Sequence, residues 1–155
     1  MMKSIPVWKQ ELSDGVHAAR LASLYCCSPA ETASEAARYT AVLDGLEKTF
    51  GSHAEAGLYS APGRTEIGGN HTDHQHGRVL AGSVNIDMIA AAAPNDKNQL
   101  RVQSEGYDLC VIDLNDLEAR KEEENTTAAL LRGECAAFTQ RGAKLAGLDV
   151  YVSSN

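Results

Sequence analysis

Apolar residues recur at helical intervals along much of the first fifty residues. Residues 1–15 carry Trp8 but little periodicity, and we expect either a loosely ordered arm or a short docking helix there. A short helix is predicted over residues 16–27. The next four residues, Ser28-Pro29-Ala30-Glu31, form a capping box with proline at the first helical position, so a second helix is predicted from here to about Phe50, with Gly51 ending it.

From residue 56 onward the pattern favours strands. Residues 56–61 alternate weakly and lead to a predicted turn at Pro62-Gly63. Residues 78–93 are rich in Val, Ile, Met and Ala, which indicates one or two buried strands that end at Pro94. Two short apolar runs, 100–104 and 109–113, are separated by a turn at Gly106 and resemble a hairpin.

The last forty residues contain a charged connector, a helix and a strand. We interpret residues 117–125, with three consecutive glutamates, as a solvated turn or helix start. After Thr126 one apolar stripe steps by three and four and predicts a helix that ends at Gly147. Gly133 and Gly142 lie inside this helix and predict close packing there, because glycine lowers helix propensity. Residues 148–153 alternate as a strand does.

This order of elements predicts an α+β fold with a mixed or antiparallel sheet backed by helices. The 155 residues are enough for one domain with its own core. Lys and Arg number 14 against 21 Asp and Glu, with no basic run, so a general nucleic-acid-binding surface is not expected. No apolar run is long enough to span a bilayer and no signal peptide is visible, so we expect a cytoplasmic protein with no membrane partner. The four cysteines lack C-x-x-C spacing and are interpreted as reduced thiols.

One segment, residues 61–77, is too polar and too rich in glycine to be ordinary core. Its sequence is APGRTEIGGNHTDHQHG. Glycines let a backbone approach a ligand closely, while Arg64, Asn70, His71 and Asp73 supply hydrogen-bond donors and acceptors. The segment therefore predicts a site for a hydroxyl-rich or phosphate-bearing small molecule.

The same segment resembles a family motif. Residues 63–80, GRTEIGGNHTDHQHGRVL, are similar to the sugar-binding signature of galactokinases, GRxNLIGEHTDYxxGxVLP. The Gly-Arg pair, the His-Thr-Asp triplet, the distance between them and the Gly-x-Val-Leu that follows are all kept. Asn70 stands where the family usually has Glu, and His74 where it usually has Tyr. Galactokinases are GHMP small-molecule kinases.

The resemblance begins near Leu43 and implies the N-terminal domain of GHMP kinases, which is like domain 2 of ribosomal protein S5. It divides the chain into a helical extension, residues 1–40, and a partial galactose-binding domain, residues 41–155. In the family, a Gly/Ser-rich loop that holds the ATP phosphates, a catalytic Asp and a C-terminal domain follow the last strand. These features are not in the sequence, so we expect a piece of a longer protein that is inactive alone.

The resemblance implies that the parent protein transfers the γ-phosphoryl group of Mg²⁺-bound ATP to O1 of galactose. It assigns Arg64 to stabilise the transition state and to contact the sugar, and Asn70, His71 and Asp73 to bind sugar hydroxyls. Ser104 stands where some galactokinases place a serine near the nucleotide. A structural pairing of Arg64 with Glu66 is the alternative for that arginine.

Other interpretations stay open. His71, Asp73, His74 and His76 are potential zinc ligands, but the distant second pair of a structural zinc site is missing, so no metal site is predicted. A galactokinase-like module could sense a sugar or bind a partner without catalysis, and Asn70 leaves room for a related sugar. The surface left by a missing domain could also drive dimerisation.

Overall fold

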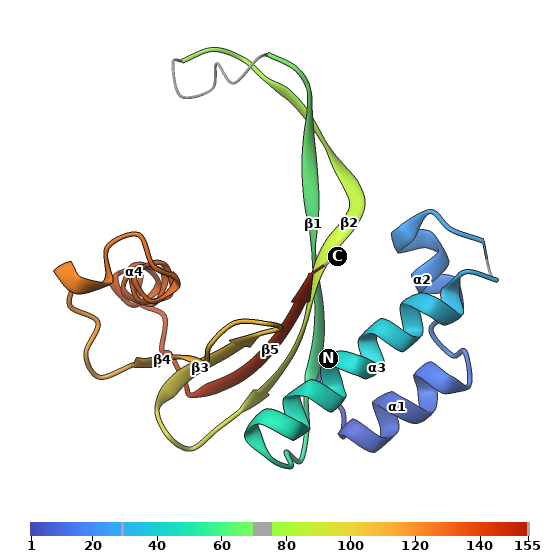
Figure 1. The fold of residues 1–155 in the computed structure, drawn as a ribbon, viewed down its shortest axis with the longest axis horizontal. Coiled ribbons are helices and arrows are strands. Elements are labelled where there is room, and N and C mark those ends of the chain that lie inside the picture. Colours follow the sequence, from blue (N-terminus) through green and yellow to red (C-terminus); the bar gives the residue numbers. More distant parts are fainter. Residues whose placement is uncertain (29, 70–75, 155) are drawn as a thin grey trace.

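The computed structural model describes residues 1–28, 30–69 and 76–154 (Figure 1). Within these ranges three α-helices come first, and five strands with a short 3-10 helix and a further α-helix follow. The elements, in chain order, are α1 (Ile5–Ser13), α2 (Ala18–Tyr25), α3 (Thr32–Phe50), β1 (Gly57–Gly68), β2 (Leu80–Pro94), β3 (Gln99–Ser104), β4 (Cys110–Asp113), the short 3-10 helix η2 (Lys121–Glu123), α4 (Thr127–Gln140) and β5 (Leu148–Ser154).

The strands form one mixed sheet in the order β1-β2-β5-β3-β4. β1 pairs with β2, β2 with β5 and β3 with β4 in antiparallel fashion, whereas β3 and β5 are parallel. The last strand in the sequence is therefore the central one, and it joins two hairpins (Figure 1). The predicted α+β fold with a mixed sheet backed by helices is confirmed.

The core lies between α1–α3 and one face of the sheet. Alternate residues of β2, namely Ile89, Ala91 and Ala93, are fully buried on this face, as are Val42 and Leu46 of α3. At the other end of the sheet α4 packs against β4 (Figure 1). Helices thus pack against the sheet both at its β1–β2–β5 part and at β4, and they cover apolar positions that would otherwise face water.

Residues 1–15 form a docking helix, the second of the two forms expected there. Ile5, Trp8 and Leu12 of α1 are buried in the same cluster as the side chains of α3 and β2. The helical extension 1–40 and the rest of the chain thus share a core, and the domain boundary at residue 40 stays a prediction.

α3 ends at Phe50 as expected, with Gly51 at φ 89°. The helix begins at Thr32, just after residues 28–31, where its start was predicted. The Glu31 carboxylate accepts hydrogen bonds from the N–H and the hydroxyl of Ser28, both at 2.7 Å, so the capping pair precedes the first helical turn. Pro29 lies outside the described residues.

The predicted turn at Pro62-Gly63 is wrong, because β1 continues through it. Pro62 pairs with Asp87 and Arg64 pairs with Ser83, so residues 84–86 of β2 face Gly63 alone. This is a β-bulge, and β1 is an edge strand in the sheet order, where a missing N–H is tolerated. The predicted buried strand over 78–93 is a single strand, β2, and only its half from Asp87 onward has a buried face.

Two predictions for α4 are also wrong. The helix ends at Gln140 rather than Gly147, because Gly142 adopts φ 87° and its N–H turns back to the carbonyl of Thr139. Close packing was predicted at Gly133, yet a Cβ there would have no neighbour within 4 Å. The connector over residues 117–125, by contrast, is mostly exposed and contains the short 3-10 helix η2, in agreement with its interpretation as a solvated turn or helix start. Within it, Glu123 accepts two hydrogen bonds from Arg132, whose side chain is only 4% exposed.

The four cysteines are free thiols, as predicted. Cys135 is buried, while Cys26 is exposed with φ 50°. None of the helices within the described ranges combines the length and the apolar character that a membrane crossing requires.

Candidate functional site

The β1–β2 hairpin reaches beyond the helix-covered part of the sheet as a long two-stranded ribbon (Figure 1). Its pairing runs from Gly57 opposite Ala92 to Gly68 opposite Leu80. Arg64 lies on the outer half, opposite Ser83, and is exposed. A guanidinium in this place is open to a ligand, with its fork of donors available for hydroxyl or phosphoryl oxygens.

The predicted sugar ligands Asn70, His71 and Asp73 lie outside the described residues, as does His74. What the structure describes is the backbone on either side. Gly69 has φ 124°, and a Cβ on it would lie 2.7 Å from the Cα of Val79. The backbone just beyond the outer ends of β1 and β2 therefore approaches so closely here that only glycine fits.

Ser104, the predicted nucleotide contact, is half-buried at the end of β3 and pairs with Val152 of β5. It lines a cavity of about 460 Å³ together with Met88, Tyr107 and Thr127, among others. Two strands, β2 and β5, separate β3 from β1 in the sheet order. Ser104 and Arg64 thus belong to different parts of the sheet, and the roles predicted for them stay predictions.

A metal site involving His76 is not supported by the part of the chain that the structure describes. His76 is exposed, with φ 62°, and no group of three His, Cys, Asp or Glu side chains able to hold a metal occurs among the described residues. The other three residues of that hypothesis, His71, Asp73 and His74, lie outside those ranges.

Sequence reasoning missed a buried polar cluster at the base of the hairpin. The carboxylate of Asp87, only 3% exposed, accepts hydrogen bonds from the Tyr25 hydroxyl and the Ser60 hydroxyl, both at 2.6 Å, and from Arg38 at 2.8 Å. Burial alone raises the pKa of Asp87, but the hydrogen bonds from Ser60, Tyr25 and Arg38 outweigh it and hold the pKa below the ordinary value. The signal was visible, since a charge within the apolar run of β2 needs partners.

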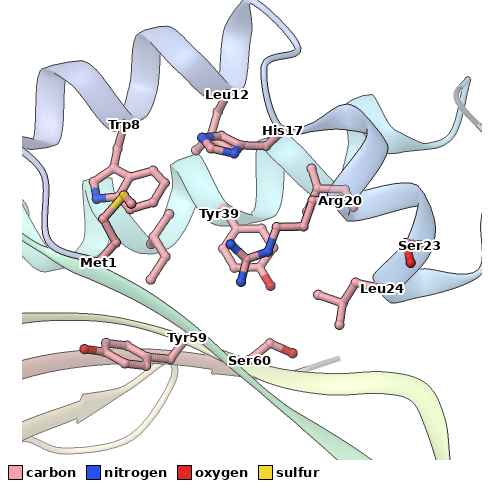
Figure 2. Close-up of a pocket in the computed structure, with 12 residues that line it drawn as sticks. Met1, Trp8, Leu12, His17, Arg20, Ser23, Leu24, Tyr39, Tyr59 and Ser60 are labelled. Carbon is pink, nitrogen blue, oxygen red and sulfur yellow. The ribbon is translucent and has the colours of Figure 1, made fainter.

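A cavity of about 490 Å³ lies beside this cluster, between α1, α2 and the start of β1. Figure 2 shows Trp8, Leu12 and Tyr39 on the helical side, Tyr59 and Ser60 below them, and Arg20 extending into the space between. Tyr39 and Ser60 also belong to the Asp87 cluster, Tyr39 through a 2.9 Å hydrogen bond to Tyr25. The cavity and the cluster therefore share two side chains.

A second buried carboxylate, Asp149, holds the other end of the sheet. It is 1% exposed and accepts hydrogen bonds from Arg101, from His53 at 2.9 Å and from Asn95 at 2.6 Å. Burial alone raises the pKa of Asp149, but these hydrogen bonds, led by that of Arg101, lower it below the ordinary value. These contacts tie β5 to β3 and to two loops, so we assign the cluster to the stability of the fold.

Residues 46–94 match the family model described as the galactokinase galactose-binding signature. On the structure this range covers the end of α3, all of β1 and all of β2. The signature therefore coincides with the hairpin that carries Arg64, and it includes Asp87.

Curated proteins named galactokinase are similar over most of the chain. The protein of Lacticaseibacillus casei strain BL23 is 28% identical over 118 residues, which are 75% of this chain and 30% of that protein. The protein of Ligilactobacillus salivarius is 30% identical over 116 residues, 72% of this chain and 29% of that protein. The protein of Streptomyces coelicolor is 29% identical over 109 residues, which are 70% of this chain and 28% of that protein. The chain thus spans about 30% of the length of the galactokinases it matches.

Among solved structures, the crystal structure of Lactococcus lactis galactokinase complexed with galactose matches with a TM-score of 0.66 and 21% identity. The match covers 74% of this chain and 30% of that chain. At this identity the likeness establishes the fold alone, which is that of the matching part of the galactokinase structure. By sequence and by fold, then, the chain is similar to part of a galactokinase, with the galactose-binding signature on the end of α3, on β1 and on β2.

Proposed function

We propose that this chain is the galactose-binding part of a galactokinase, an enzyme that phosphorylates galactose at O1 with ATP. The observation that carries the proposal is the match of residues 46–94 to the galactose-binding signature, with Arg64 exposed on the hairpin that this range forms. The relatives named galactokinase support it, since they are similar over about three quarters of the chain.

In the proposed reaction the O1 oxygen of galactose attacks the γ-phosphorus of ATP. The bond between that phosphorus and the β,γ-bridging oxygen breaks, ADP leaves, and O1 gives up its proton. Negative charge spreads over the transferred phosphoryl group, and positioned positive charge stabilises it. Arg64 supplies this charge in the proposal and also contacts the sugar near O1, which eases loss of the O1 proton.

The sugar is held by the side chains that follow Arg64. A carboxylate such as that of Asp73 accepts charge-assisted hydrogen bonds from two neighbouring hydroxyls at once. His71 donates to or accepts from another hydroxyl. Asn70 replaces a family glutamate, and its amide adds donors while removing a charge, so a related sugar is the variant of this proposal to test alongside galactose.

ATP and Mg²⁺ are the cosubstrate and the ion that a galactokinase reaction implies. Within the described residues we assign Ser104 and its cavity to the nucleotide side of the reaction. The phosphate-binding loop and the catalytic Asp of the family are not in the 155-residue sequence, so we expect no galactose-dependent ATP turnover from it. A cytoplasmic location and self-association through exposed apolar surface are further parts of the proposal.

The test is a heteronuclear NMR titration of the 155-residue protein with galactose, with glucose as the control sugar and Asp73→Ala as the control variant. Chemical-shift changes at Arg64, Asn70, His71 and Asp73 with galactose alone, and their loss in the variant, are the expected result. A well-dispersed spectrum that galactose leaves unchanged, even at tens of millimolar, overturns the proposal for this chain.

A sugar-sensing module without catalysis is the second candidate, and the departures at Asn70 and His74 from the family signature favour it. The two candidates share the sugar site but differ in the nucleotide site. Magnesium-dependent ATP binding by the full-length parent, with galactose-dependent ADP release, supports the enzyme. Galactose binding without ADP release by the parent supports the module.

A further inference from the structure

The outer half of the hairpin depends on few contacts with the core. On β2, Ile89 is fully buried and Asp87 is 4% exposed, whereas Ile86 is 57% and Leu80 is 62% exposed. Asp87 is therefore the outermost buried residue of this strand. Every described β2 residue between it and the tip is at least partly exposed.

Asp87 is held from three directions. Its carboxylate accepts hydrogen bonds from Tyr25 at the end of α2, from Arg38 in α3 and from Ser60 on β1. Arg38 is itself fixed by a 2.6 Å ion pair with Glu35, and its guanidinium carbon lies 5.7 Å from the centre of the Tyr25 ring. One side chain thus connects both strands of the hairpin to the helices behind them.

The bulge follows immediately on the outer side of Asp87. Residues 84–86 face Gly63 there, and a Cβ on Gly63 would lie 3.2 Å from both the carbonyl oxygen of Ile86 and the Cγ2 of Val84. A bulge bends the strand that carries it and changes its twist, so the direction of the outer strand depends on how the inner side is held. On β2 the inner side is held at Asp87.

We propose that Asp87 is a positioning residue for the sugar site: its hydrogen bonds to Tyr25, Arg38 and Ser60 set the direction in which the outer hairpin, with Arg64 on it, leaves the core. The link between this orientation and sugar binding rests on the proposed function. In this role Asp87 touches neither sugar nor nucleotide. It acts through the backbone of β2 and the bulge.

Asp149 provides a matched control, because it is a similarly buried and hydrogen-bonded aspartate but lies opposite Ala93, at the end of β2 far from the outer hairpin. It accepts hydrogen bonds from one arginine and two other side chains, as Asp87 does from Arg38, Tyr25 and Ser60. Asp149→Asn should therefore lower stability without turning the hairpin. A purely structural role for Asp87 predicts that Asp87→Asn behaves in the same way.

The first measurement needs no ligand. Residual dipolar couplings of the N–H bonds at Arg64, Thr65, Gly82 and Ser83 report the orientation of the outer hairpin relative to α3, and ¹⁵N order parameters report its motion. In Asp87→Asn we expect these couplings to shrink and the order parameters to fall below about 0.6, with α3 unchanged. If the dipolar couplings of Asp87→Asn equal those of wild type while its stability is lowered as in Asp149→Asn, the proposal is overturned.

The second measurement is galactose affinity of the same proteins at a temperature where all are folded. Loss of one charge-assisted hydrogen bond predicts a rise in Kd of about tenfold for Asp87→Asn, against less than about twofold for Asp149→Asn. Equal effects of the two variants on Kd overturn the link to the sugar site. If wild-type protein does not bind galactose, the proposed function fails, while the dipolar couplings still decide whether Asp87 orients the hairpin.

Tyr25→Phe and Ser60→Ala cover the case in which Asp87→Asn does not fold. Each removes one donor and leaves Arg38 on the carboxylate, so each should give a smaller change in the hairpin couplings in the same direction. Wild-type couplings in both of these variants count against the proposal.

Discussion

The indole N–H of Trp8 donates a hydrogen bond to the carbonyl oxygen of Ala56, 48 residues later in the sequence, at 2.8 Å. The same oxygen accepts a hydrogen bond from the backbone N–H of Lys3 at 3.1 Å. The carbonyl oxygen of Lys3 in turn accepts one from the backbone N–H of Ala56 at 2.8 Å. Trp8 is 9% exposed and lies in the main core cluster. The N-terminal helix is therefore anchored directly to the residue that precedes β1.

We predict that Trp8→Ala lowers the free energy of unfolding by about 3–5 kcal/mol, because it leaves a large cavity and removes this hydrogen bond. Trp8→Phe should cost less, since most of the ring volume stays and Lys3 still donates to Ala56. Urea denaturation followed by circular dichroism measures both. Unchanged stability in Trp8→Ala would show that α1 is not part of the core.

Two glycines should respond to alanine in opposite directions. At Gly45 of α3 a Cβ would lie 2.4–2.6 Å from ring carbons of Tyr151, so Gly45→Ala should destabilise the protein by about 1–3 kcal/mol through overpacking. At Gly133 of α4 nothing lies within 4 Å, so Gly133→Ala should stabilise it by roughly 0.5–1 kcal/mol through helix propensity. Thermal unfolding of the two variants in parallel is the measurement, and a shift of the same sign in both contradicts the packing described here.

The tip of the hairpin offers another matched pair. Gly69 has φ 124° and a Cβ there would lie 2.7 Å from the Cα and a side-chain carbon of Val79, whereas Gly68 has no atom within 4 Å of that position. Under the proposed function Gly69→Ala should weaken galactose binding by about tenfold or more, because the strand ends must shift. Gly68→Ala should bind within about twofold of wild type. Isothermal titration with galactose distinguishes them, and equal affinities would mean that the tip geometry does not matter for the sugar.

Acid should destabilise the protein through Asp149. The hydrogen bonds to this buried carboxylate, from Arg101 first, lower its pKa against the opposing effect of burial. A lowered pKa in the folded state means that the stabilisation is complete above the unfolded value of about 3.9 and is lost as pH falls through the lower folded value.

Asp149→Asn should therefore be less stable at neutral pH, by about 3 kcal/mol, because Arg101 is left without its partner. Its stability should also change less between about pH 5 and pH 2 than that of wild type. Denaturant midpoints measured across this range give the comparison, with exposed Asp96→Asn as the control variant. If the stability of Asp149→Asn fell with pH as steeply as that of wild type, this carboxylate would be excluded as the source of the acid sensitivity.

Local chemistry was enough to predict several elements. The end of α3 at Phe50 follows from apolar spacing and from Gly51, whose positive φ is a short-range property of glycine. The same short-range logic failed at Pro62-Gly63. A proline and a glycine suit a turn and an edge-strand bulge equally well, and only the partner strand β2 decides between them.

The sheet order and the buried clusters lay beyond local pattern. Nothing near Leu148 in the sequence shows that β5 inserts between β2 and β3. For the site, the motif directed attention to Arg64, which the structure places on an exposed strand. Asp87 was passed over because its partners come from α2, α3 and β1, between 27 and 62 residues away. A charged residue inside an apolar strand was the clue that the pattern did contain.

The central position of β5 has a consequence for how the protein forms during synthesis. Residues 148–154 leave the ribosome after both hairpins, yet they pair with β2 on one side and β3 on the other. Until then the β1–β2 ribbon and the β3–β4 ribbon have no strand between them, and each presents an unpaired edge to other nascent chains. Closure of the sheet is thus a late, long-range step, and mutations in β5 should reduce soluble yield more than their effect on equilibrium stability would suggest.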